Sequence, residues 1–237
     1  MEATPARPAA GAVAGIDALV SGIERRLADW AAEVGERLAA LSGKATGTAI
    51  DKIVRPTVEV LLTGDSPVAG AGFIANAGLL GPDRSYIAWW QGPELERVDA
   101  LANFSPSSVS RYVRAEWFRI PVETGLPHVT GPYVDFLCTD EYVLTFTHPV
   151  FTSAQDPVAG IVGLDVTVQA MEQAVRAALR NVGPRATLVN ADGRAIASAA
   201  PEIEAGDLTA AGGEPLPAGG ESPVGSRFRI LHEARPL

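Results

Sequence analysis

The chain has 237 residues, of which 47% are hydrophobic and 20% charged, and a formal net charge of −9. This composition is typical of a globular protein with a substantial core. The acidic balance, without any basic run, argues against nucleic-acid binding, because phosphate backbones are bound by clustered Lys and Arg. The single cysteine, Cys138, excludes an internal disulfide framework.

Nothing in the sequence predicts a membrane segment. The longest apolar runs fall well short of the roughly 18 to 20 residues that a spanning helix needs. Residues 1–15 are rich in Ala, Pro and Gly, and they lack the basic start and apolar core of a secretory signal. We therefore expect a cytoplasmic protein that does not contact a membrane.

An apolar stripe predicts a long helix over residues 12–42. Its members recur every three or four positions and, without Val20, repeat every eleven residues, which keeps a helical stripe nearly straight. They are Ile16, Leu19, Val20, Ile23, Leu27, Trp30, Val34, Leu38 and Leu41. The stripe could pack on the protein's own sheet or on a second copy, and the pattern leaves both open. We expect a homodimer with residues 16–41 in or near the interface, because the stripe exceeds what one small sheet covers.

Strand-like runs follow the helix. Residues 58–64 and 70–76 predict a hairpin, residues 85–91 a third strand, and residues 111–118 a short helix. Three further strands are predicted from Trp117 onward, and residues 167–179 form the next helix. A hairpin over residues 185–203 turns at Asn190–Gly193. A last strand over residues 226–234 comes after a low-complexity stretch.

Three of these strands carry a resemblance. In order they read GPYVD (Gly131–Asp135), LTFTHPV (Leu144–Val150) and AGIVGLDV (Ala159–Val166). The series resembles the Cache family of sensor modules, which have a PAS-like antiparallel sheet around a small-molecule pocket. The hairpin at residues 185–203 is similar to the opening strands of the second module in double Cache proteins, with too little chain after it to complete one.

The resemblance implies an α+β fold with a long N-terminal helix and a PAS-like sheet of at least five antiparallel strands. Residues 1–56 would be an N-terminal helical region, residues 57–182 the ligand-binding domain, and residues 183–237 a C-terminal strand extension or truncated second module. It also implies a cytosolic sensor that binds an amino acid, amine or organic acid. Such a sensor uses no cofactor, catalyses no reaction and signals through a protein partner that the sequence does not name.

The candidate site lies on one face of the predicted strands. Alternation separates a wholly apolar face from a mixed one, and the mixed face carries Tyr133, Thr145 and Asp165, with glycines that leave room for a ligand. In the family, the aspartate at the position of Asp165 binds a ligand's amino group, and an arginine shortly before a Trp-aromatic pair binds its carboxylate. Trp117 matches that tryptophan, whereas Arg114 stands one position too early, which leaves an amine, a carboxylate or an aromatic metabolite open. From the residues alone, Asp165 could instead cap the next helix, and Trp117 could be core.

An enzyme is the alternative function. No His or Cys pair has metal-ligand spacing, so no metal site is predicted. Gly64-Asp65-Ser66 follows an apolar run and resembles the nucleophile block of GDSL-type serine esterases. Those enzymes take their base from a late Asp-x-x-His, because a serine hydroxyl is a poor nucleophile unaided. Arg229 stands at that aspartate position before His232.

Overall fold

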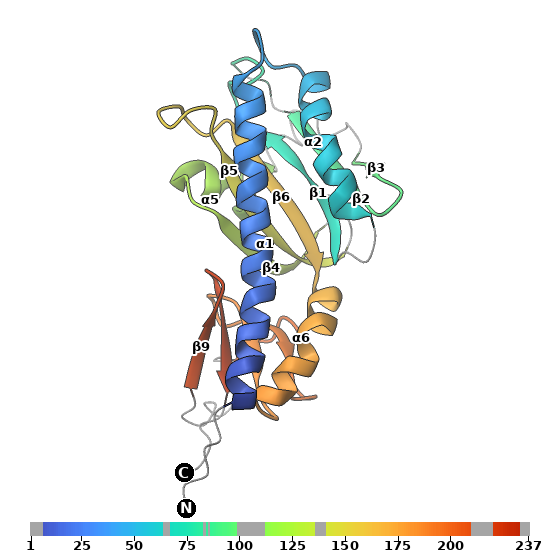
Figure 1. The fold of residues 1–237 in the computed structure, drawn as a ribbon, viewed down its shortest axis with the longest axis vertical. Helices are drawn as coiled ribbons and strands as arrows, with labels where there is room; N and C mark the ends of the chain where they lie inside the picture. Colours follow the sequence, from blue (N-terminus) through green and yellow to red (C-terminus); the bar gives the residue numbers. More distant parts are fainter. Residues whose placement is uncertain are drawn as a thin grey trace, which may run out of the picture. The chain divides into compact units, whose positions relative to one another are not determined.

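The structure is a computed structural model that describes residues 7–63, 67–82, 84, 86–98, 112–135, 141–209 and 220–232. Two compact units divide the chain. The six-stranded unit comprises Arg25–Thr130 and Val134–Thr167, and the four-stranded unit comprises Met1–Glu24, Gly131–Tyr133 and Val168–Leu237. Helix α1 (Arg7–Ala39), labelled in Figure 1, contributes residues to both units.

The six-stranded unit is built on an antiparallel sheet. Its strands are β1 (Val68–Ala75), β2 (Tyr86–Gln91), β3 (Glu96–Arg97), β4 (His128–Val134), β5 (Tyr142–Val150) and β6 (Gly160–Thr167). They lie in the order β3-β2-β1-β6-β5-β4. Strands β3, β2, β1, β6 and β5 pair antiparallel with one another. The predicted α+β fold with a long N-terminal helix and a PAS-like sheet is therefore confirmed.

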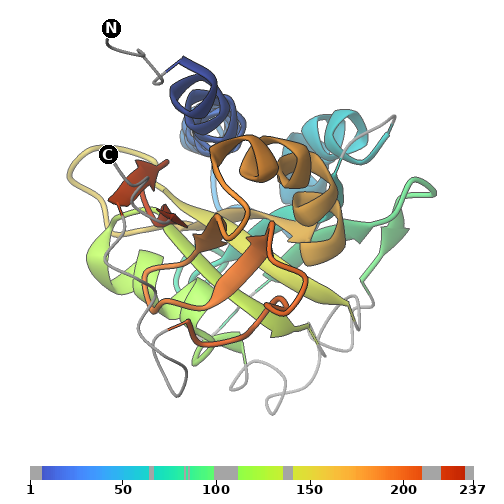
Figure 2. The same ribbon diagram turned by 90° about the horizontal axis from the view of Figure 1, so that it is seen from below.

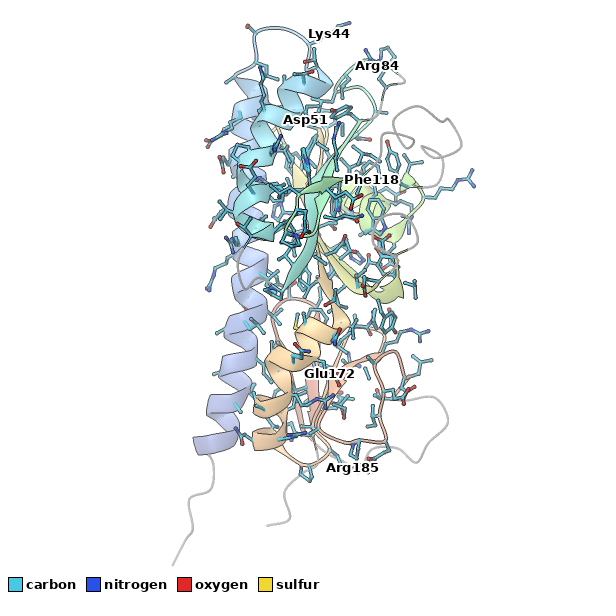
Figure 3. The ribbon with its side chains drawn as sticks, turned by 90° about the vertical axis from the view of Figure 1, so that its right-hand side faces the viewer. Lys44, Asp51, Arg84, Phe118, Glu172 and Arg185 are labelled. Carbon is cyan, nitrogen blue, oxygen red and sulfur yellow. The ribbon has the colours of Figure 1, made fainter. Side chains whose placement is uncertain are left out.

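Helices cover the two faces of this sheet. Helix α2 (Gly47–Leu62) packs on β1 and β2, and helix α5 (Glu116–Thr124) packs on β5 and β6. Figure 3 shows them on opposite sides of the strands, with Phe118 on the α5 side. The hydroxyl of Tyr86 donates to Asp51 of α2 at 2.8 Å, which identifies the α2 face as the one that carries Tyr86 and the residues alternating with it. The opposite face, toward α5, is the mixed face of the sequence pattern.

One predicted strand is wrong. Residues 58–62 belong to helix α2 and not to a hairpin with residues 70–76. Valine-rich runs favour strands locally, but here the apolar side chains bury a helical face, and tertiary packing outweighs propensity. The Thr46 side chain accepts from the Ala49 N–H and so caps the helix, which continues through Pro56. The short helix predicted at residues 111–118 begins later, at Glu116, and Arg111 lies outside the described residues.

The stripe of α1 packs within the chain. Six of its members are buried: Ile16, Val20, Leu27, Trp30, Val34 and Leu38. Leu19, Ile23 and Leu41 are half-buried. Of the two arrangements left open by the sequence, packing on the protein's own core is the one observed. The homodimer with residues 16–41 in or near its interface stays a prediction.

The four-stranded unit has a second sheet. Its strands are β7 (Thr187–Val189), β8 (Ala195–Ser198), β9 (Gly220–Val224) and β10 (Phe228–His232), in the order β8-β7-β10-β9. Helix α6 (Val168–Val182) packs on β8, and Figure 2 shows this helix and the strands from below. The predicted hairpin turn is confirmed, with Gly193 at φ +79° and the Asn190 side chain accepting from two backbone N–H groups. The last predicted strand is β10.

Helix α1 also holds the turn between β9 and β10. The Asp17 carboxylate accepts from the Gly225 N–H at 2.8 Å, and Glu24 accepts from both the N–H and the hydroxyl of Ser226. An ideal Cβ on Gly225 would lie 2.6 Å from the Val20 side chain, so only glycine fits there. These contacts seat the hairpin on α1. Among the described residues, no helix is long and apolar enough to cross a membrane.

Candidate ligand-binding site

Asp165 is the centre of the mixed face. It lies in β6 between Gly70 of β1 and Thr145 of β5, and it is 2% exposed. The Thr145 hydroxyl donates to Asp165 Oδ1 at 2.6 Å. Burial raises the pKa of Asp165 to about 8, against a lowering by the Thr145 bond and a further rise from the charge of Asp135. The carboxyl is therefore mostly protonated near neutral pH when no cation is bound.

Asp165 does not cap helix α6. Helix α6 begins at Val168, so the residue that precedes it is Thr167. Asp165 is a paired strand residue whose carboxyl bonds to a neighbouring strand. Its side chain thus belongs to the sheet face and not to the helix terminus.

Asp135 is a second buried carboxyl near this site. It follows β4, is 4% exposed, and donates its backbone N–H to the Glu141 carbonyl at 2.9 Å. Its charge contributes to the raised pKa of Asp165. The prediction from sequence did not include Asp135, although it alternates with Tyr133 along GPYVD and so shares its face. Because the charge of Asp135 opposes ionisation of Asp165, a cationic occupant would favour the ionised form of Asp165.

The glycines of this face make room for a tryptophan. An ideal Cβ on Gly70 would lie 2.9 Å from Trp89 Nε1, one on Gly72 would lie 2.8 Å from Trp89 Cε3, and one on Gly163 would lie 3.1 Å from Trp89 Cη2. The indole of Trp89 therefore spreads over the bare backbone of β1 and β6. Of the glycines that the sequence predicted to leave room for a ligand, Gly163 lies under this ring. The sequence did not predict Trp89 as a site residue. Alternation along β2 could have identified it, because it places Trp89 on the mixed face of the sheet.

The other predicted residues have different settings. Trp117 lies on α5, is 9% exposed and packs edge-on against Phe118. Arg114 is exposed in the turn before α5, so the structure does not bring it to the buried carboxyls. Tyr133 is half-buried in the stretch of β4 assigned to the four-stranded unit, and its role stays a prediction.

His128 borders helix α5. His128 Nε2 lies 2.8 Å from the Glu116 carboxylate, and the His128 carbonyl accepts from Thr147. His148 of β5 lies 2.9 Å from the Pro149 carbonyl through Nδ1. Within the described part of the chain no group of three His, Cys, Asp or Glu side chains could hold a metal ion.

A scan against protein-family models and a search of curated proteins each found no match. Solved structures match over nearly the whole chain. The ligand-binding domain of the Pseudomonas aeruginosa amino-acid chemoreceptor PctC, in complex with GABA, has a TM-score of 0.59 at 12% identity and covers 94% of each chain. The Pseudomonas fluorescens chemoreceptor CtaA with L-valine has a TM-score of 0.58 at 14% identity, with 95% of this chain and 94% of that chain covered.

A third match is the ligand-binding domain of the P. aeruginosa chemoreceptor PctB with L-Gln, at a TM-score of 0.59 and 17% identity, covering 94% of this chain and 86% of that chain. At such identities the likeness concerns the fold. The fold is thus that of Cache-type ligand-binding domains of chemoreceptors, which confirms the resemblance at this level. The Ser66 of the esterase alternative lies outside the described residues, as does Cys138.

Proposed function

We propose that the chain is a sensor module that binds a small metabolite through its amino group, with Asp165 as the principal contact. The observation that carries this is a carboxyl that is 2% exposed and, among the described residues, has no basic partner. A buried carboxylate is costly unless a cation or several donors accompany it. A ligand ammonium supplies both, through charge-assisted hydrogen bonds.

The ligand class follows from the two carboxyls and the fold. Asp135 and Asp165 together disfavour a purely anionic ligand, so we infer an amine or amino acid and not a simple organic acid. The molecules bound by the similar domains, GABA, L-valine and L-Gln, all carry an amino group. Thr145 orients Asp165, Trp117 lies above β5 on α5, and Tyr133 remains a proposed wall. Arg114 is the weakest member of the proposed site because its side chain is exposed.

Signal output is also part of the proposal. Strand β6 continues from Asp165 into α6, which starts at Val168. A shift of Asp165 on binding therefore acts on α6 through only two intervening residues. We infer that occupancy is passed this way to a protein partner. The homodimer and the cytoplasmic location rest on the sequence alone, and light scattering and cell fractionation test them.

A thermal-shift screen over amino acids, amines, organic acids and purines tests the function. A ligand at about 100 times its Kd should stabilise the folded state by about 2.7 kcal/mol. Asp165→Asn should weaken binding about ten- to a hundredfold, because it removes a charge-assisted bond. Asp29→Asn, at an exposed position of α1, is the matched control. Stabilisation only by ligands without an amino group, or unchanged affinity in Asp165→Asn, would refute the proposal.

A further inference from the structure

Trp89 contains an unused hydrogen-bond donor. Its side chain is 4% exposed, and its indole nitrogen has no hydrogen-bond partner among the described residues. Buried donors are normally paired, because leaving one without an acceptor forfeits its interaction with water. The Trp89 indole lies on the same face of the sheet as Asp165 and Thr145.

The donor lies close to Asp165, and both lie beside Gly70. An ideal Cβ on Gly70 would lie 2.9 Å from Trp89 Nε1 and 3.1 Å from Asp165 Oδ2. The nitrogen and the oxygen are therefore no more than about 6 Å apart, and a side chain on Gly70 would contact both. Two polar groups this close can contact the same small ligand.

The indole is also held in place. Its ring rests on Gly72 and Gly163 as well as on Gly70, with approaches that leave no room for a Cβ on Gly72. The neighbouring backbone of Ala88 would lie 2.2 Å from that Cβ. The direction of the N–H is thus set before any ligand arrives, and a preorganised donor loses little entropy on binding.

We propose that Trp89 is a specificity-determining residue, whose indole N–H binds an acceptor oxygen of the same ligand that Asp165 holds by its amino group. This inference rests on the proposed function. An ammonium has only donors and cannot accept from an indole N–H. The acceptor must therefore be a second group, a carboxylate, carbonyl or hydroxyl oxygen close to the amine. Trp89 would take the recognition role that Arg114, exposed in its turn, is not placed to fill.

Matched pairs of probes test this on the wild-type chain. Calorimetry with L-valine against isobutylamine, and with L-alanine against ethylamine, compares ligands that differ by the carboxylate. We expect each amino acid to bind about tenfold or more tightly than its amine, the effect of a hydrogen bond to a charged group. Trp89→Phe should remove that preference, so that amino acid and amine bind alike. Trp90→Phe is the control, because Trp90 is equally buried and points to the opposite face of β2.

Each outcome decides between the two proposals. Equal binding of amine and amino acid, with both weakened by Asp165→Asn, overturns the role of Trp89 and leaves the proposed function intact. No binding of any probe overturns both. If Trp89→Phe does not fold, Gly70→Ala serves instead, since its Cβ would press on both Trp89 Nε1 and Asp165 Oδ2, with Gly22→Ala in an open helix position as control. In wild type, the indole N–H resonance of Trp89 should move on adding L-valine and not on adding isobutylamine; movement with neither contradicts the inference.

Discussion

Replacing Asp165 by Asn should change how stability depends on pH. An ordinary aspartate has a pKa of 3.8, whereas burial raises the pKa of Asp165 to about 8. Between these values the folded protein holds a proton that the unfolded chain has released. The free energy of unfolding therefore falls as pH rises through this window, and the stabilisation present below it is lost above it. Asn cannot titrate and so lacks this slope.

The magnitude follows from the difference in pKa. Each pKa unit corresponds to about 1.4 kcal/mol, so the whole window, from 3.8 to about 8, corresponds to roughly 6 kcal/mol. From about pH 5 to about pH 8 the wild type should lose roughly 4 kcal/mol relative to Asp165→Asn. Ligand must be absent, because a bound ammonium would stabilise the charged form.

Urea unfolding of both proteins at a series of pH values measures this difference. Asp29→Asn, at an exposed position of α1, controls for the loss of one negative charge. The reasoning is refuted if wild type and Asp165→Asn keep parallel stability curves across the window. It is also refuted if the wild type gains stability relative to the variant as pH rises, since that is the sign expected for a carboxylate paired with a cation.

Three further predictions follow from the same contacts. Binding of an ammonium should release close to one proton near neutral pH, because Asp165 must ionise; calorimetric enthalpies should then differ between phosphate and Tris buffers, and equal values contradict it. Thr145→Val should weaken ligand binding about three- to tenfold by removing the bond at 2.6 Å, and Thr145→Ser should restore it. Glu24→Ala should destabilise the protein by about 1 to 2 kcal/mol and speed amide exchange at Ser226, whose N–H and hydroxyl it holds. Unchanged exchange at Ser226 would show that the turn is held by other contacts.

The sequence alone determined the elements whose signals are local. The long helix follows from its apolar spacing, and the order of β4, β5 and β6 follows from alternating runs between turn residues. The same alternation placed Thr145 and Asp165 on one face, and their hydroxyl–carboxyl bond confirms that placement. These features are readable because period and turn chemistry are carried by residues close together in the chain.

Only the tertiary structure decided the rest. Strand β1 lies between β2 and β6, so Gly70 meets Asp165, a pairing across 95 positions that no local pattern encodes. Trp89 then lies over glycines from two strands, and residues 58–62 are helical because their apolar side chains find a sheet to cover. The raised pKa of Asp165 also depends on burial by neighbours distant in sequence. Burial and non-local pairing are properties of the packed chain, and they override local preference wherever the two conflict.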